Sequence, residues 1–186
     1  GVDQVFTVTG GGSMFLNQAF GNHTDITSFY MHHEQACAMA AEGYARISNK
    51  PAVVVLTTGP GSINALNGVF GAYTDSIPMV VISGQVKTET CLSFYDDLDL
   101  RQLGDQEGPT IEMVRPICKY ARIIRTPQDL TTALPEAFTL ALSGRPGPVW
   151  LDIPLDIQSS IEEIEIPDTD LASKNKSDKT LIENVN

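Results

Sequence analysis

Short runs rich in β-branched and aromatic residues alternate with segments long enough to form helices, and this alternation constrains the fold most strongly. The runs are residues 5–8, 26–31, 52–57, 79–83, 120–124 and 149–153. The third contains Val53-Val54-Val55-Leu56, which is apolar at every position, as expected for a strand covered on both faces. The sequence therefore predicts an α/β fold: a parallel sheet of about six strands, with helices on both faces and residues 52–57 near the centre.

Three helices can be predicted between these runs. Residues 35–46 form the first, and residues 62–74 carry apolar side chains at helical spacing and form the second. The third begins near Thr126-Pro127-Gln128-Asp129, with a capping hydroxyl, a proline in the first turn and an acid near the positive end of the helix. Pro135 is predicted to kink this helix or split it in two.

The 186 residues suit one α/β domain. From Ser159 the composition becomes acidic, then lysine-rich, with few large apolar residues. We predict a domain over residues 1–158 and, over residues 159–186, a linker or disordered tail towards a missing central domain. Because the first predicted strand lies almost at the start, the sequence is expected to be an excerpt of a longer chain.

Charge and hydropathy exclude several classes of partner. The formal net charge of -11 argues against nucleic acid, since phosphate binding needs a basic face. No segment is apolar for long enough to span a bilayer, so no membrane partner is expected. The cysteines, Cys37, Cys91 and Cys118, have neither CxxC nor zinc spacing and indicate packing roles in a reducing cytoplasm.

Three loops follow the first three predicted strands, and they contain the residues best suited to binding. They are residues 9–13 with a triple glycine, residues 32–34 with His-His-Glu, and residues 58–64 with Gly-Pro-Gly and an asparagine. In an open parallel sheet, ligands bind at the carboxyl ends of the strands. The three loops are therefore predicted to converge at one edge.

Each loop taken alone also has an ordinary structural interpretation. The triple glycine suits a tight turn, and it fails as a dinucleotide fingerprint because Phe15 stands where GxGxxG requires glycine. Glu34 could serve only to stabilise the start of a helix. His32 and His33 have no third ligand at a suitable spacing, so no metal site is assigned.

Five linked motifs taken together change this interpretation. They are His33-Glu34-Gln35 with Ala41-Glu42-Gly43-Tyr44-Ala45-Arg46; Thr58-Gly59-Pro60-Gly61 with Asn64; Asp75-Ser76-Ile77-Pro78; Gly84-Gln85; and Gly144-Arg145-Pro146-Gly147-Pro148-Val149 with Asp152-Ile153-Pro154. In order and spacing they resemble the N-terminal, pyrimidine-binding domain of thiamine-diphosphate-dependent enzymes of the acetolactate synthase type. The resemblance covers roughly residues 5–158.

The resemblance implies a role for particular residues. The glutamate matching Glu34 hydrogen-bonds N1′ of the cofactor's aminopyrimidine and so promotes deprotonation of the thiazolium C2, a task that suits a carboxyl group able to share a proton. Residues matching Gly59, Pro60, Gly61 and Asn64 lie beside the aminopyrimidine. A glycine matching Gly11 lines the space over the thiazolium, and Gln106 is a candidate on the substrate side.

The resemblance also implies what this chain lacks. Family members hold the diphosphate through Mg²⁺ bound by a separate domain with a Gly-Asp-Gly segment, whereas here Gly104-Asp105 is followed by Gln106. We expect a homodimer or higher assembly in which a partner subunit supplies the diphosphate-binding domain, and a 2-keto acid as substrate. Thr9 and Asp105 depart from the acetolactate synthase pattern, and an acid at 105 would disfavour an anionic acceptor such as pyruvate.

Two other hypotheses remain open from the sequence. One is a non-catalytic dimerisation or regulatory module with the same fold, which would have no need of an acid at Glu34. The other is a nucleotide-binding Rossmann domain, which the failed glycine fingerprint weakens.

Overall fold

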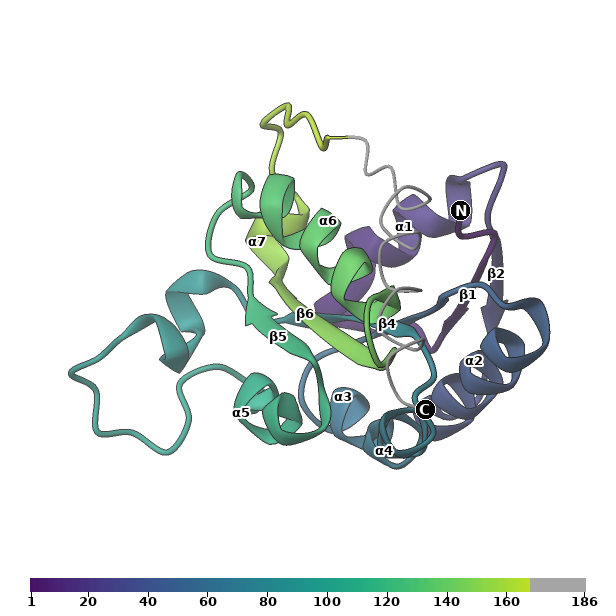
Figure 1. The fold of residues 1–186 in the computed structure, drawn as a ribbon. Helices are drawn as coiled ribbons and strands as arrows, with labels where there is room; N and C mark the ends of the chain where they lie inside the picture. Colours follow the sequence, from purple (N-terminus) through teal and green to yellow (C-terminus); the bar gives the residue numbers. More distant parts are fainter. Residues whose placement is uncertain (168–186) are drawn as a thin grey trace.

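In a computed structural model, which describes residues 1–167, the chain forms a six-stranded sheet whose paired strands are all parallel (Figure 1). The strands are β1 (Gln4–Thr7), β2 (Thr27–Tyr30), β3 (Ala52–Leu56), β4 (Met79–Gln85), β5 (Tyr120–Ile123) and β6 (Pro148–Pro154). They lie in the order β2-β1-β3-β4-β6-β5. The predicted fold class is confirmed, and each predicted run overlaps one strand.

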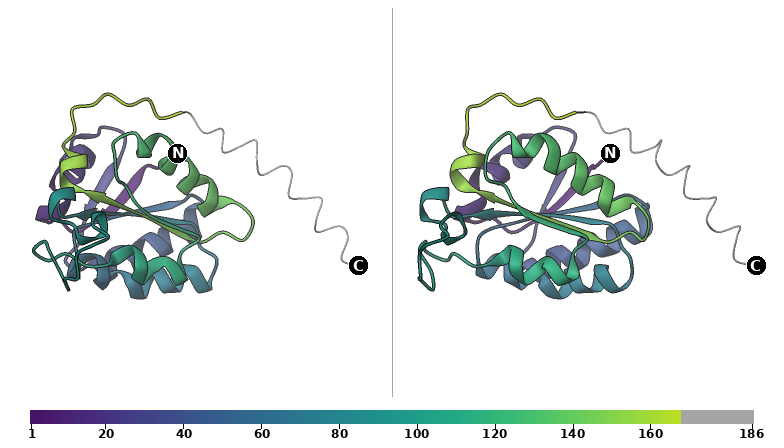
Figure 2. Two further views of the ribbon diagram at one scale, coloured as in Figure 1. Left: turned by 90° about the vertical axis from the view of Figure 1, so that its left-hand side faces the viewer. Right: turned by 60° about the vertical axis from the view of Figure 1, so that its left-hand side comes forward.

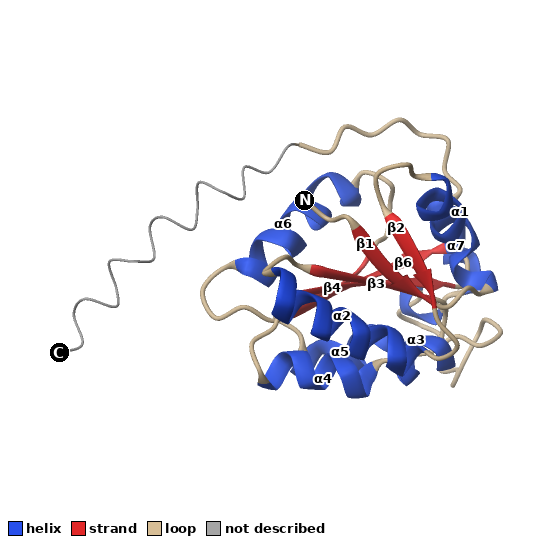
Figure 3. Cartoon of the chain, turned by 90° about the vertical axis from the view of Figure 1, so that its right-hand side faces the viewer, coloured by secondary structure: helices blue, strands red, loops and turns tan. Residues whose placement is uncertain are grey.

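Helices cover both faces of this sheet (Figures 2 and 3). One face carries α2 (Glu34–Ser48), α3 (Pro60–Asn64), α4 (Leu66–Thr74) and α5 (Thr110–Val114). The other carries α1 (Met14–Asn22), α6 (Asp129–Leu142) and α7 (Leu155–Gln158). Single 3-10 turns lie at η1 (Gly11–Ser13), η2 (Thr88–Thr90), η3 (Leu92–Phe94) and η4 (Arg115–Ile117).

The central strand β3 divides the core into two layers. Val54 and Leu56 pack into the cluster beneath α2 and α4, whereas Val53 and Val55 pack into the cluster beneath α6. Successive side chains of a strand point to opposite faces, so a strand covered twice must be apolar at every position. All five residues of β3 are buried, which confirms its predicted central place.

Two helices differ from their predictions. The predicted helix over residues 62–74 is two helices, because α3 begins at Pro60 and the chain turns at Ala65, whose N–H bonds the Ser62 carbonyl in place of a continued α-helical pattern. Of the two alternatives predicted at Pro135, a kink or a split, the split does not occur, since α6 runs from Asp129 to Leu142. Its buried Ala133, Ala137 and Ala141 hold it against the sheet on both sides of the proline.

The strand order creates a crevice at the carboxyl edge of the sheet. β1 and β3 are neighbours, and the connections that leave them run on opposite faces: α1 follows β1 on one face, and α3 and α4 follow β3 on the other. Ligands bind in open α/β sheets at such a switch point, because the connections diverge there. The fold therefore places a crevice beyond the ends of β1 and β3.

The last regular element, α7, ends at Gln158, where the predicted domain ends, and residues 159–167 form neither helix nor strand. Residues 168–186, most of the predicted tail, lie outside the described part of the chain.

Cys37 and Cys91 are buried, and burial raises the pKa of these thiols to about 12 and about 11. Within residues 1–167, no helix is long and apolar enough to cross a membrane. The cytoplasmic location stays a prediction.

Candidate functional site

The three predicted loops converge on one cavity of about 500 Å³ at the crevice. The residues that line it are Gly10, Gly11, Gly12, Glu34, Thr57, Thr58, Pro60, Gly61, Asn64, Asp105 and Gln106. They come from the ends of β1, β2 and β3 and from a fourth segment, Asp105 and Gln106, of which Gln106 was predicted on the substrate side. The predicted site residues are thus brought together, except that Gly59 is not among the residues that line the cavity.

Glu34 opens helix α2 and is only 9% exposed. The residue before it caps the helix, because His33 Nδ1 accepts from the Gln35 N–H at 3.1 Å. The Glu34 carboxylate is engaged instead by a side chain of α3, since Asn64 Nδ2 donates to Glu34 Oε2 at 2.9 Å. This geometry separates the capping role, taken by His33, from a carboxylate that faces the cavity.

The glycine loop after β1 is held in place through hydrogen bonds to its backbone groups. The Gly12 N–H donates to Thr57 Oγ1 at 3.1 Å, and Gln158 Nε2 of α7 donates to the Gly12 carbonyl at 2.7 Å. A Cβ atom at Gly12 would lie 1.9 Å from Thr58 Oγ1, whereas one at Gly11 would meet nothing within 4 Å. Gly12 thus allows close packing on β3, and Gly11 faces open space.

The Gly59–Gly61 turn forms the opposite wall. Gly59 has a φ of +55°, and a Cβ there would lie 1.9 Å from the Gln106 carbonyl oxygen. At Gly61 a Cβ would lie 2.6 Å from the Thr57 methyl group and 3.2 Å from Glu34 Oε1. Glycine at both positions therefore lets Gln106 and Glu34 approach the turn closely.

Asp105 and Gln106 close the remaining side, and both are exposed. Gln106 has a φ of 61°, the left-handed region that few non-glycine residues adopt. The charged residues that line the cavity, Glu34 and Asp105, are both acidic. Among residues 1–167, no group of three His, Cys, Asp or Glu side chains is placed to hold a metal ion.

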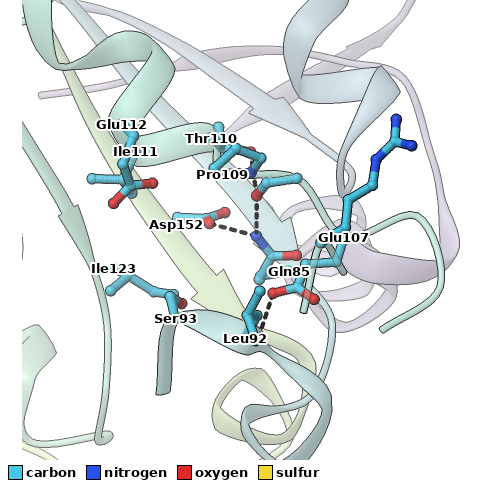
Figure 4. Close-up of a pocket in the computed structure, with 12 residues that line it drawn as sticks. Gln85, Leu92, Ser93, Glu107, Pro109, Thr110, Ile111, Glu112, Ile123 and Asp152 are labelled. Carbon is cyan, nitrogen blue, oxygen red and sulfur yellow. Dashed lines mark hydrogen bonds between the residues drawn. The ribbon is translucent and has the colours of Figure 1, made fainter. Parts of the chain in front are cut away.

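A second cavity of about 280 Å³ lies beyond the ends of β4 and β6, and its lining includes Gln85 and Asp152 (Figure 4). Asp152 is 1% exposed and accepts from Ser83 Oγ at 2.5 Å and from Gln85 Nε2 at 2.9 Å. Trp150 Nε1 in turn donates to Ser83 Oγ at 2.8 Å. Burial raises the pKa of the Asp152 carboxyl to about 7, against the opposing hydrogen bonds from Ser83 and Gln85.

Sequence reasoning assigned no role to several residues that shape the two cavities. Thr57 and Gln158 hold the glycine loop, and Gln85 and Asp152 support the second cavity. Gln85 and Asp152 stood in motifs without a function. One sequence feature could have identified them. Each is a polar side chain near the carboxyl end of a strand that is otherwise mainly apolar, and that end of the sheet is where water or a ligand can bind.

Comparisons with known proteins agree with this architecture. Residues 1–106 match the family described as "Thiamine pyrophosphate enzyme, N-terminal TPP binding domain". Chloroplastic acetolactate synthase of Arabidopsis thaliana is 39% identical over 94% of this chain, and the acetolactate synthase large subunit of Lactococcus lactis is 38% identical over 96%. The chain spans only 24% and 30% of these two relatives.

Solved structures show the same fold. Benzoylformate decarboxylase from Polynucleobacter necessarius has a TM-score of 0.74 with 25% identity over 90% of this chain and 30% of its own. A thiamin diphosphate-dependent enzyme from Mycobacterium smegmatis has a TM-score of 0.73 with 24% identity, over 89% of this chain and 31% of its own. On the family match and the acetolactate synthase relatives, the chain belongs to the thiamine-diphosphate-dependent enzymes, as their N-terminal cofactor-binding domain.

Proposed function

We propose that this chain provides the aminopyrimidine side of a thiamine-diphosphate site in an acetolactate synthase-like enzyme that acts on 2-keto acids. The observation that carries the proposal is the placement of Glu34. Its carboxylate is almost fully buried, is oriented by Asn64, and faces a cavity with glycine-rich walls at the switch point of the sheet. A helix-capping residue would not need this arrangement.

The cavity walls fit a flat heteroaromatic ring followed by a cationic one. Gly61 leaves room next to Glu34, and a Cβ at Gly11 would meet nothing within 4 Å, so neither lining glycine fills the cavity with a side chain. The two acids that line the cavity favour the neutral pyrimidine and the positive thiazolium over the diphosphate. The diphosphate and its Mg²⁺ therefore belong, in this proposal, to a separate domain supplied by a partner subunit.

Glu34 has a defined task in this arrangement. Its carboxyl group shares a proton with the N1′ atom of the aminopyrimidine, and Asn64 holds the carboxylate in the orientation that this contact needs. When bound, thiamine diphosphate supplies the electron sink for decarboxylation and carboligation of 2-keto acids. Gln106, at the open side, is assigned to the substrate, and the neighbouring Asp105 disfavours an anionic acceptor.

We also propose a homodimer or larger assembly through the face formed by α2 and α4. Met39, Phe70 and Tyr73 on this face are 47%, 53% and 43% exposed, which is high for large apolar side chains. A second copy that covers them would bury this surface. Light scattering of the complete protein tests the assembly, and a strictly monomeric species would contradict it.

The test of the proposed function is hydrogen–deuterium exchange at C2 of the cofactor, measured on the complete protein saturated with thiamine diphosphate and Mg²⁺. Glu34→Gln should slow the exchange by about 10²- to 10⁴-fold, because the amide cannot exchange a proton with N1′ as a carboxyl does. Glu112→Gln is the control, since it replaces a glutamate by glutamine in the same way but in the second cavity, away from Glu34. It should leave the exchange near the wild-type rate.

Equal exchange in wild-type protein and Glu34→Gln would remove Glu34 from the chemistry and leave it a structural residue. Absence of cofactor binding to wild-type protein would favour a non-catalytic dimerisation or regulatory module with this fold.

A further inference from the structure

One short turn of the chain separates the two cavities. Asp105 and Gln106 line the cavity that contains Glu34, and Glu107, Gly108 and Pro109 line the second cavity. Gln106 has a positive φ, and its carbonyl oxygen packs against Gly59. The conformation of this turn therefore determines both where Gln106 lies and how closely the turn packs against Gly59.

A left-handed glutamine costs on the order of 1–3 kcal/mol unless its surroundings impose it. The Glu107 carboxylate provides such a constraint. Its Oε2 accepts from the Leu103 and Gly104 N–H groups, both at 3.0 Å, and its Oε1 accepts from the Leu92 N–H (Figure 4). One half-buried carboxylate thus closes the turn on itself and attaches it to η3 through charge-assisted hydrogen bonds.

The far end of the turn is fixed from the sheet. Gln85, 2% exposed, donates from Nε2 to the Gly108 carbonyl at 3.3 Å and to Asp152 at 2.9 Å. Its Oε1 accepts from the Val86 N–H at 3.0 Å, so the side chain is held at both ends. The turn is therefore anchored to β4 on one side of Gln106, while Glu107 closes it on the other.

We propose that Glu107 is a positioning residue: its carboxylate holds the turn at residues 103–108 so that Gln106 faces the cofactor cavity. The proposal rests on the proposed function, because Gln106 is assigned to the substrate there. Glu107 itself lines the second cavity and acts through Gln106. The effect of Glu107 on catalysis should therefore disappear in a variant in which Gln106 is replaced by alanine.

The first measurement does not depend on activity. In the complete protein without cofactor, Glu107→Gln should speed backbone amide exchange about 10-fold or more in peptides that cover residues 92–94 and 103–108, because the amide side chain cannot accept from all three N–H groups. The matched control is Glu112→Gln, which removes the same charge from the lining of the same cavity. It should leave those peptides at wild-type rates.

The second measurement is a double-mutant cycle on kcat/KM for pyruvate decarboxylation by the complete holoenzyme. Glu107→Gln should lower kcat/KM about 10-fold or more, mainly through KM, and Glu112→Gln should stay within about 2-fold of wild type. Adding Glu107→Gln to Gln106→Ala should change the value by less than about 2-fold.

Additive losses in the cycle, or wild-type exchange in residues 103–108 of Glu107→Gln, would overturn the proposal. Cofactor C2 exchange separates this failure from failure of the proposed function. Glu107→Gln should keep wild-type C2 exchange, since Glu34 is intact. If wild-type protein shows no C2 exchange, the proposed function fails, whatever the cycle gives.

Discussion

The two cavities at the carboxyl edge of the sheet lie on opposite sides of one turn, yet they are built in different ways. The lining of the cavity beside Glu34 includes four glycines, Gly10–Gly12 and Gly61, whose backbone forms part of the wall. The cavity beside Asp152 is supported by buried side chains, among them Gln85 and Ser83, which form a hydrogen-bonded network.

This difference predicts how each cavity responds to change. A cavity wall made of backbone does not tolerate added atoms, because an extra methyl group either collides with a neighbour or fills the space. A cavity supported by buried polar side chains does not tolerate the loss of one of them, because each hydrogen-bonding partner left unpaired costs free energy. Substitutions can test both halves of this comparison.

The largest effect on stability is expected at Gly59. Alanine there must keep a φ of +55° and would place its Cβ 1.9 Å from the Gln106 carbonyl oxygen, so Gly59→Ala should lower the free energy of unfolding by about 2–5 kcal/mol. Gly144 has the same φ of +55° but nothing within 4 Å of a Cβ. Gly144→Ala should therefore cost only about 1–2 kcal/mol.

Urea unfolding followed by the fluorescence of Trp150, the single tryptophan of this chain, measures both variants. Equal losses at the two glycines would show that backbone strain alone explains Gly59, and that the contact with Gln106 does not shape the wall.

An intermediate effect, dependent on pH, is expected at Asp152. At pH 5, Asp152→Asn should cost about 1–3 kcal/mol, because one of the two oxygens that accept from Ser83 and Gln85 becomes an NH₂ group, which cannot accept a hydrogen bond. Burial raises the pKa of this carboxyl to about 7, so between about pH 4 and pH 7 the folded state keeps a proton that the unfolded state releases. The stability that this proton confers is lost as the pH rises through about 7.

The advantage of wild type over Asp152→Asn should therefore shrink from pH 5 to pH 8 in thermal unfolding. Asp105→Asn, an exposed carboxylate in the other cavity, is the charge-matched control. A wild-type advantage that grows with pH would mean that the network stabilises the ionised carboxylate, against the role of burial described above.

The smallest effect on stability is expected at Gly11. A Cβ there meets nothing within 4 Å, so Gly11→Ala should leave the unfolding free energy unchanged or raise it by about 0.4–1 kcal/mol. The same methyl group enters the cavity and should weaken binding of thiamine diphosphate to the complete protein, measured by calorimetry. Unchanged affinity would show that Gly11 does not face the cofactor.

Local patterns in the sequence predicted the strands and the two longest helices, α2 and α6, but not α1, α5 or α7. The apolar run at β3 and the periodic apolar face of α6 determine their own burial, because periodicity and burial have the same physical origin. The break at Ala65 was missed, and the sequence left open whether α6 continues through Pro135. Both depend on packing against other elements, which local propensity does not contain.

By itself, the sequence determined the residue types and the order of the loops that converge, including Glu34 between two glycine-rich loops. Only the tertiary structure decided that His33 takes the capping role, that Asn64 orients Glu34, and that Glu107 holds the turn beside it. The first kind of information is local along the chain. The second consists mainly of hydrogen bonds between residues that the strand order brings together, such as Glu34 and Asn64, and spacing along the chain does not specify such pairs.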